Sequence, residues 1–220
     1  MLKFLSYPIK KTVPGYGNHR KKLPILQTRS MRQGDACDIF SFTMDNHWGT
    51  HVDCPAHFLK GGKRVADLPP ETWRFRFPQI VSVKLEAGEL MTPEHLASSI
   101  KSRTDLLLLR SGWSKFRGTA RYSRKNPGVH ASVGRLLRTR YPKIRAIGFD
   151  WVSLSSFLHR EAGWDAHRAF LDSKLPGSPI LILEDMDLRA ADSRIREVWA
   201  LPLRIDGIDS APCTVVGVFQ

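Results

Sequence analysis

Seven short runs of apolar and β-branched residues recur along the chain, and they constrain its fold more than any other feature. Each run has the length of a strand and is bounded by glycine, proline, aspartate or charged residues. The runs cover residues 39–44, 80–85, 106–109, 144–149, 180–183, 198–205 and 214–219. We therefore expect a protein built largely on a sheet.

Three stretches between these runs have helical patterns. Thr92 fits an N-cap, with Pro93 at the first helical position and Glu94 near the positive end of the helix dipole, which predicts a helix over residues 92–100. Residues 132–140 and 161–171 are the other two candidates. Strands mixed with few helices predict an α/β or α+β fold with a mixed sheet. A length of 220 residues suits a single domain, residues 1–220.

The same sequence argues against a membrane or secreted protein. No apolar run approaches the ~20 residues that a membrane span needs. Lysine and proline interrupt the N-terminal segment before a signal-peptide core could form. The three cysteines, Cys37, Cys54 and Cys213, are widely separated, which is typical of reduced cysteines and not of a disulfide framework. We therefore expect a cytoplasmic protein.

The chain is strongly basic, with 34 lysines and arginines against 21 acidic residues and a net charge of +13. Such a surface could attract nucleic acid, anionic lipid or an acidic small molecule. The basic clusters lack the Cys/His finger and the aromatic RNA-binding patterns, so we interpret them as a solvated surface. A nucleic-acid-binding protein with a non-catalytic metal site remains the alternative of a different class.

Four ionisable residues are crowded into the segment NHWGTHVDCPAHF, residues 46–58. On a helix His47 and His51 would share a face, but Asp53 would then point away from them. In an extended chain alternate side chains share a face, so His47, His51 and Asp53 would project together, and Pro55 would end the strand and return His57 to the same pocket. Burying these groups without a cation would leave polar atoms with too few partners. The extended arrangement predicts a site for Zn²⁺, Mn²⁺ or Fe²⁺.

Further ligands for a second metal would have to come from the C-terminal half. His167 lies in a predicted helix, and Glu184 ends an apolar strand. Other side chains in this half could also serve, namely His159, Glu161, Asp165, Asp185 and Asp187.

The segment HWGTHVDCPAHF resembles the H-x-G-T-H-x-D-x-P-x-H signature of the metal-dependent cyclase/hydrolase family, which includes kynurenine formamidases and isatin hydrolases. The resemblance extends over nearly the whole chain, through FLSYPI, VPGY, GGKRVADLP, LLLLRSGWSKF, HREAGWDAHRAFL, ILILEDMDL and LPLRIDGIDSAPCTVVGV. It implies a swivelling β/β/α fold, a homodimer or homotetramer, and a centre that holds two Zn²⁺ or Mn²⁺ ions. The loop DSKLPGSP lengthens the spacing between His167 and Glu184 relative to the formamidases.

The resemblance also implies roles for individual residues. His47, His51 and Asp53 match ligands of the first metal, with Asp53 able to bridge; His167 matches a ligand of the second, and Glu184 a second bridging carboxylate. His57 matches the catalytic histidine, and His159 is the reserve candidate for the second metal.

These roles predict hydrolysis of an amide-type C–N bond, with N-formylkynurenine to kynurenine and formate, a step of tryptophan catabolism, as the type reaction. A metal would lower the pKa of its water toward about 7, and His57 would move a proton to the leaving nitrogen. Hydrolysis of another lactam, lactone or imide, or cyclase chemistry, is the alternative within the family. We expect a small-molecule substrate. A flat aromatic molecule with an anionic group is one candidate. Candidate substrate-binding residues are Trp48, Trp113, Phe58, Tyr16 and Arg110, although core packing is the alternative for each aromatic residue.

Overall fold

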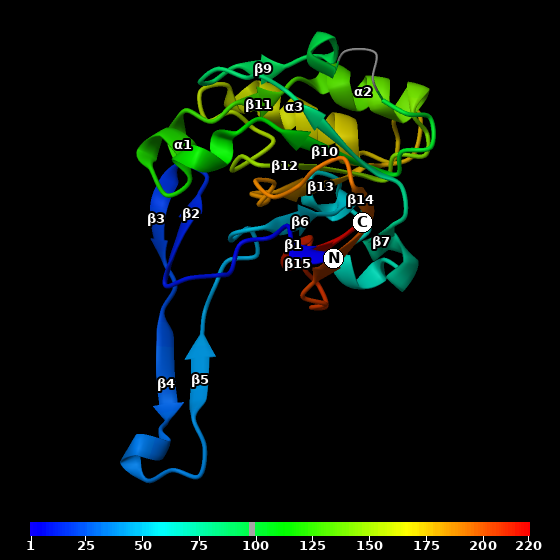
Figure 1. The fold of residues 1–220 in the computed structure, drawn as a ribbon. Helices are drawn as coiled ribbons and strands as arrows, with labels where there is room; N and C mark the ends of the chain where they lie inside the picture. Colours follow the sequence, from blue (N-terminus) through cyan, green and yellow to red (C-terminus); the bar gives the residue numbers. More distant parts are fainter. Residues whose placement is uncertain (97–99) are drawn as a thin grey trace.

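A nine-stranded mixed sheet organises the chain in the computed structural model, which describes residues 1–96 and 100–220 (Figure 1). Eight strands follow one another across the sheet, and the ninth, β1 (Leu2–Phe4), pairs with β15. In spatial order the eight are β7 (Arg74–Phe75), β14 (Ile195–Pro202), β15 (Ser210–Phe219), β6 (His51–Asp53), β13 (Leu181–Glu184), β12 (Ala146–Phe149), β10 (Leu106–Arg110) and β8 (Pro78–Ser82).

The direction of the strands changes at β6. Strands β8, β10, β12 and β13 run parallel to one another, whereas β6 runs antiparallel to both β13 and β15. Every residue of β12 and β13 is buried, which explains why these parallel strands read as continuous apolar runs. The three residues of β6 are also buried, but two of them are ionisable.

Two apolar clusters lie on the two faces of the parallel strands. On one face, Leu107 and Ile147 pack with Leu137 of α2 (Ala131–Arg140) and Phe170 of α3 (Arg160–Leu171). On the other face, alternate strand residues such as Leu108 pack against the buried side of β14 and β15. The result is a layer of helices over two layers of sheet (Figure 1), which confirms the mixed α/β class predicted from the sequence.

Six of the seven predicted strands overlap strands of the main sheet, namely β8, β10, β12, β13, β14 and β15. The run at 198–205 is displaced, because β14 begins at Ile195 and ends at Pro202. The short strands β1 and β7 have no sequence signal of their own, whereas β6 falls within the extended segment predicted around His51 and Asp53. Residues of β6 carry no apolar alternation, since the strand is buried around polar side chains.

Two of the three predicted helices are confirmed as α2 and α3. In the third, Pro93–Leu96 forms a 3-10 helix, and the predicted continuation over residues 97–99 lies outside the described residues. A short helix that was not predicted, α1 (Ala120–Arg124), is capped by the Thr119 hydroxyl, which accepts from the backbone N–H of Tyr122. None of the helices in the described part of the chain is long and apolar enough to span a membrane.

The remaining predicted strand, at 39–44, lies outside the main sheet. It forms β5 (Ile39–Phe42), which pairs with β4 (Ile25–Arg29) in a hairpin that projects from the body of the molecule (Figure 1). We call residues 25–42 the β4–β5 arm. Every residue of its two strands is exposed. Two further small sheets are β2 (Thr12–Gly15) with β3 (Asn18–Lys22), and β9 (Leu90–Met91) with β11 (Gly128–Val129).

Candidate metal centre

Strand β6 and its neighbour β13 place three ionisable side chains together. His51 and Asp53 are alternate residues of β6 and so lie on the same face. Glu184, the last residue of β13, pairs directly with His51 across the two strands. The Nε2 atom of His51 lies 3.6 Å from Oδ1 of Asp53 and 3.4 Å from Oε2 of Glu184. All three side chains are buried.

His47 reaches the same cluster from a turn and not from the strand. Residues 46–50 form turns and bends, and Gly49 has a φ of +62°, a left-handed conformation that glycine adopts without strain. The prediction of one extended segment from His47 to Asp53 is therefore wrong for its first half. The ring of His47 nevertheless lies with Nδ1 3.2 Å from Oδ1 of Asp53 and Nε2 2.8 Å from the Ser210 hydroxyl.

His57 returns to the cluster as predicted, because the chain turns at Pro55 into a single 3-10 turn, Pro55–His57. Its ring centroid lies 4.4 Å from that of His47. The Nδ1 atom lies 2.7 Å from Oδ2 of Asp209, which favours the proton on Nδ1 and leaves Nε2 free to accept one. Burial alone would raise the pKa of Asp209, but the contact with His57 outweighs it and holds that pKa below its usual value.

His167 enters from α3 and faces the two buried carboxylates. Its Nε2 lies 3.9 Å from Oδ2 of Asp53 and 3.8 Å from Oε1 of Glu184. Its Nδ1 contacts the backbone carbonyl of Gly163 at 2.8 Å, as Nδ1 of His51 contacts that of Gly49 at 2.9 Å. A histidine that binds a metal through one nitrogen usually donates the other N–H to such an acceptor.

The long loop between His167 and Glu184 packs away from this cluster. The buried guanidinium of Arg138 donates to the carbonyls of Asp172, Leu175 and Gly177 at 2.7–2.8 Å. These hydrogen bonds fix the loop against α2, so that its extra length leaves His167 and Glu184 facing one another.

The side chains form two overlapping ligand sets. His47, Asp53 and His57 form one, and His51, Asp53 and Glu184 the other, with one ligand atom per residue and all such atoms of a set within 4.8 Å of one another. Asp53 belongs to both. This arrangement could hold two cations that share one carboxylate.

Unsatisfied polar atoms are concentrated at the same place. Among the described residues, seven buried side-chain nitrogen or oxygen atoms have no hydrogen-bond partner, and three of them are Nε2 of His51 and both carboxylate oxygens of Asp53. Their contacts of 3.2–3.9 Å are within ion-pair distance but lack hydrogen-bond geometry. Leaving such atoms unpaired is costly, by about 1–3 kcal/mol for each group. Imidazole and carboxylate ligands around a divalent cation would satisfy all three.

The pKa shifts of His51 and Asp53 also indicate that the two carboxylates favour a positive charge beside them. Burial alone would lower the pKa of His51, but attraction to Asp53 and Glu184 outweighs it and raises the pKa to about 9. Burial would raise the pKa of Asp53, but His51 and His47 hold it well below its usual range. His167 has a lowered pKa because burial dominates there. Without a metal, a proton on His51 therefore supplies the charge that a cation would bring.

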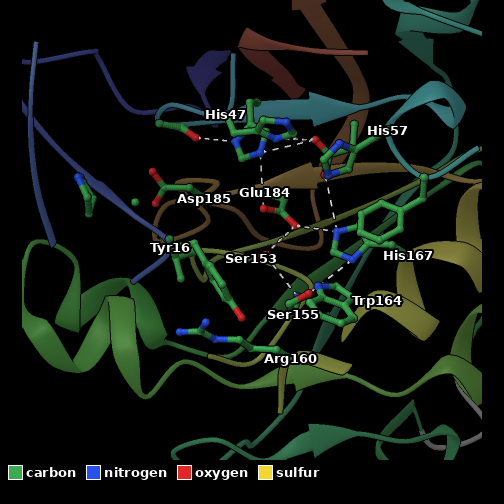
Figure 2. A pocket seen from close by; sticks show the side chains of 17 residues that line it. Tyr16, His47, His57, Ser153, Ser155, Arg160, Trp164, His167, Glu184 and Asp185 are labelled. Carbon is green, nitrogen blue, oxygen red and sulfur yellow. Dashed lines mark hydrogen bonds and ion pairs between the residues drawn. The ribbon is translucent and has the colours of Figure 1, made fainter. Parts of the chain in front are cut away.

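The ligand sets open onto a cavity of about 330 Å³ (Figure 2). Its lining comprises Pro14, Gly15, Tyr16, His47, Gly49, His51, Asp53, His57, Phe58, Val152, Ser153, Ser155, Arg160, Trp164, His167, Glu184 and Asp185. Asp185 is turned toward Arg117 by a positive φ of 50° and accepts hydrogen bonds from it at 2.7 and 2.9 Å, and one from the Tyr122 hydroxyl. This buried network supports the backbone next to Glu184.

Residues 4–156 match the family model described as "Putative cyclase", a segment that is well over half of the 220-residue chain. The chain belongs to this cyclase family. The kynurenine formamidase of Bordetella avium is 27% identical over 186 residues, which are 81% of this chain and 79% of that protein. The kynurenine formamidase of Polaromonas naphthalenivorans is 25% identical over 189 residues, 85% of this chain and 77% of that protein.

Solved structures share the fold of the cyclase-family chain. Isatin hydrolase A from Labrenzia aggregata, bound to benzyl benzoate, has a TM-score of 0.79 at 19% identity and covers 100% of this chain and 94% of its own. A predicted metal-dependent hydrolase from Bacillus stearothermophilus has a TM-score of 0.76 at 20% identity, with coverages of 99% and 97%. The resemblance inferred from the histidine motif is thereby confirmed.

Two of the predicted substrate-binding residues line the cavity, and three do not. Tyr16 and Phe58 belong to the lining. Trp48 instead packs in a small core with Val13 and Leu23. The predictions for Trp48, Trp113 and Arg110 are therefore corrected.

The turn after β10 explains two of these corrections. The buried carboxylate of Asp150 accepts from the backbone N–H groups of Ser111 and Gly112, both at 2.8 Å, and fixes the turn over β12. Trp113 is buried there, and its indole N–H donates to the carbonyl of Leu85. The guanidinium of Arg110 does not line the cavity and donates instead to the carbonyl of Ala191 at 2.7 Å.

The structure also brings residues to the site that the sequence reasoning did not select. Asp209 comes from the residue just before β15, because Ser210 pairs with Asp53 of β6. Arg160 and Trp164 lie one helical turn apart on α3, a spacing that could have indicated a shared face. The reserve ligand His159 is exposed and does not line the cavity.

Proposed function

We propose that this chain is a metal-dependent hydrolase that cleaves an amide-type carbon–nitrogen bond of a small molecule. The observation that carries the proposal is the set of unpartnered buried atoms on His51 and Asp53, facing a cavity next to the His57–Asp209 pair. Relatives named kynurenine formamidase, at 25–27% identity, support the reaction class.

His47, His51, Asp53, His167 and Glu184 are the residues that would hold one or two Zn²⁺ or Mn²⁺ ions. A cation bound there would lower the pKa of a water molecule toward about 7 and polarise the carbonyl group to be attacked.

His57 would move the proton. Asp209 holds the ring with Nδ1 as the donor, so Nε2 can take a proton from the attacking water and pass it to the leaving nitrogen. His57 also belongs to one ligand set, and the two roles differ in their consequence. If His57 moves protons, His57→Ala keeps the metal and loses turnover; if it is a ligand, the metal is lost as well.

The specific form of the proposal is cytoplasmic hydrolysis of an N-formyl arylamine such as N-formylkynurenine, as a step of tryptophan catabolism. Cyclic substrates are the alternative within the family, since the solved structures with this fold include isatin hydrolases. A nucleic-acid-binding role is not favoured, because the ligand sets lie in a small cavity of about 330 Å³ and not on an open basic surface.

The test is metal analysis of the purified protein followed by hydrolysis assays. We expect one or two equivalents of zinc or manganese per chain, and metal-dependent release of formate from an N-formyl arylamine or opening of a lactam or imide. Asp53→Asn removes the carboxylate common to both ligand sets and should abolish metal binding and turnover together. A fully loaded protein that opens none of these bonds, or a protein that binds no divalent cation, would refute the proposal.

We also propose that the chain forms a homodimer or homotetramer through the β4–β5 arm. The arm exposes large apolar side chains, including Leu26, Phe40 and Phe42, and an isolated two-stranded hairpin is marginally stable in water. At its base lies a cavity of about 710 Å³ lined by uncharged residues only. Within the arm two arginines balance two aspartates, so copies of a +13 chain can meet there without strong repulsion. In sedimentation experiments the full chain should be an oligomer, and a variant with residues 27–40 replaced by a short turn should be a monomer. The same oligomeric state for both proteins would refute the proposal.

A further inference from the structure

One cationic side chain lines the candidate active site, and its position bears on the choice of substrate. Arg160 is the single lysine or arginine among the described residues that line the cavity. It lies in the first turn of α3, and Trp164 follows one turn later with 47% of its surface exposed. In Figure 2 both residues lie at the end of the pocket away from His47.

The guanidinium of Arg160 is held by an aromatic ring and not by a carboxylate. It lies 4.2 Å from the centroid of the Phe157 ring, which in turn packs edge-on against Tyr16 at 5.3 Å. Tyr16 is fixed by its hydroxyl, which donates to the carbonyl of Ser156. Within the described part of the chain Arg160 has no ion pair, in contrast to Arg168 on the same helix, which pairs with Asp165 at 2.9 Å. A cation oriented by stacking and without a carboxylate partner is available to a ligand.

The acidic groups of the cavity do not compete for Arg160. Asp53 and Glu184 lie in the ligand sets, and Asp185 is paired with Arg117 at 2.7 Å. An anionic substituent on a substrate would therefore meet its complementary charge at the α3 end of the cavity, where Trp164 and Tyr16 offer ring faces.

Building on the proposed function, we infer that Arg160 selects aromatic amide substrates that carry a carboxylate. The ring of the substrate lies between Trp164 and Tyr16, and its carboxylate pairs with the guanidinium, while the amide faces His57. Arg160 is a specificity-determining residue, in the place that the sequence reasoning gave to Arg110.

The test compares two probes of nearly the same shape, 2-formamidobenzoate and its neutral counterpart 2-formamidobenzamide, by release of formate from the metal-loaded protein. Hydrogen bonds to charged groups contribute about 1.5–3 kcal/mol, so we expect the unsubstituted protein to prefer the carboxylate by roughly 10–100-fold in kcat/KM. Arg160→Gln should reduce this preference by about tenfold or more, mainly through KM, and Arg160→Lys should retain part of it. Arg168→Gln removes the same charge from the same helix outside the cavity and should leave the preference unchanged.

A preference that is the same in Arg160→Gln as in the unsubstituted protein would overturn the inference. A direct binding measurement separates this outcome from failure of the proposed function. If neither probe is hydrolysed, calorimetry with 2-aminobenzoate and with aniline still reports on Arg160: the carboxylate should bind at least about tenfold more weakly to Arg160→Gln, since 1.4 kcal/mol corresponds to a factor of ten. Equal affinities for 2-aminobenzoate would reject the role of Arg160 whatever the reaction.

Discussion

Replacing Gly163 by alanine tests the packing that holds α3 over the candidate metal centre. A Cβ atom on Gly163 would lie 2.1 Å from Oγ, 2.4 Å from Cβ and 2.7 Å from Cα of Ser155. Rotation of the serine can relieve the first contact but not the contact with its Cα. The backbone of α3 or of the segment around Ser155 must therefore move. The carbonyl of Gly163 also contacts Nδ1 of His167 at 2.8 Å, so a displaced helix changes the orientation of a proposed ligand.

The magnitude follows from two opposing effects. Overpacking of a buried site costs about 1–3 kcal/mol. Alanine recovers about 1 kcal/mol over glycine through its higher helix propensity. Because the contact with Cα of Ser155 requires a backbone shift, the upper part of the overpacking range applies, about 2–3 kcal/mol. The net loss in the free energy of unfolding is then about 1–2 kcal/mol, which lowers Tm by roughly 2–8 °C for a chain of this size.

Thermal unfolding of the metal-free protein isolates this effect from metal binding. Gly163→Ala should melt earlier and bind less metal than the unsubstituted protein, and adding Ser155→Gly should recover part of both losses, because it removes the two closest contacts. A Gly163→Ala protein with an unchanged or higher Tm and full metal content would show that α3 does not pack as closely as described.

Four further outcomes can be measured on the same protein. Asp209→Asn removes the acceptor that orients His57 and should lower turnover by up to about 10²–10⁴-fold, the usual contribution of general acid–base catalysis; loss of bound metal by mass spectrometry would contradict this. Stripping the metal with a chelator should lower the free energy of unfolding by about 2.7 kcal/mol relative to protein in a metal concentration 100 times Kd, and an unchanged melting curve would argue against a site in the folded state. Arg117→Met leaves the buried carboxylate of Asp185 without its cation and should cost about 3–5 kcal/mol in urea unfolding, whereas a loss below about 1 kcal/mol would show that the pair is dispensable. In the metal-free protein the pKa of His51 is raised to about 9, above the ~6.5 of an unfolded histidine. The stability that protonated His51 contributes is therefore complete below about pH 6.5 and is lost as the pH rises through about 9. Urea midpoints that stay constant from pH 6 to pH 10 would refute this.

The part of the site that is local in sequence could be predicted, and the part that depends on strand pairing could not. His47, His51, Asp53 and His57 fall within eleven residues, so their spacing alone indicated a cluster. The conformation before His51 was not predictable from that spacing, because Gly49 allows a left-handed turn that places His47 by another route.

Asp209 illustrates what the sequence lacks. It lies 152 residues from His57, and only the pairing of β15 with β6 brings the two together. Similarly, the apolar run at 39–44 was a correct strand prediction, but its pattern did not indicate which strand it would pair with. The run instead lies in the exposed β4–β5 arm, because its partner strand is the neighbouring β4 and not a strand of the main sheet.

Strand β6 is hydrogen-bonded along both edges, to β13 and to β15. His51 and Asp53 therefore cannot loosen their hold through fraying of a free strand edge. A bound ion would have to dissociate through the mouth of the cavity. Its dissociation rate would therefore depend on side chains such as Trp164 and not on local opening of the sheet. Chelators should then extract metal faster from a Trp164→Ala protein, even though Trp164 contributes no ligand.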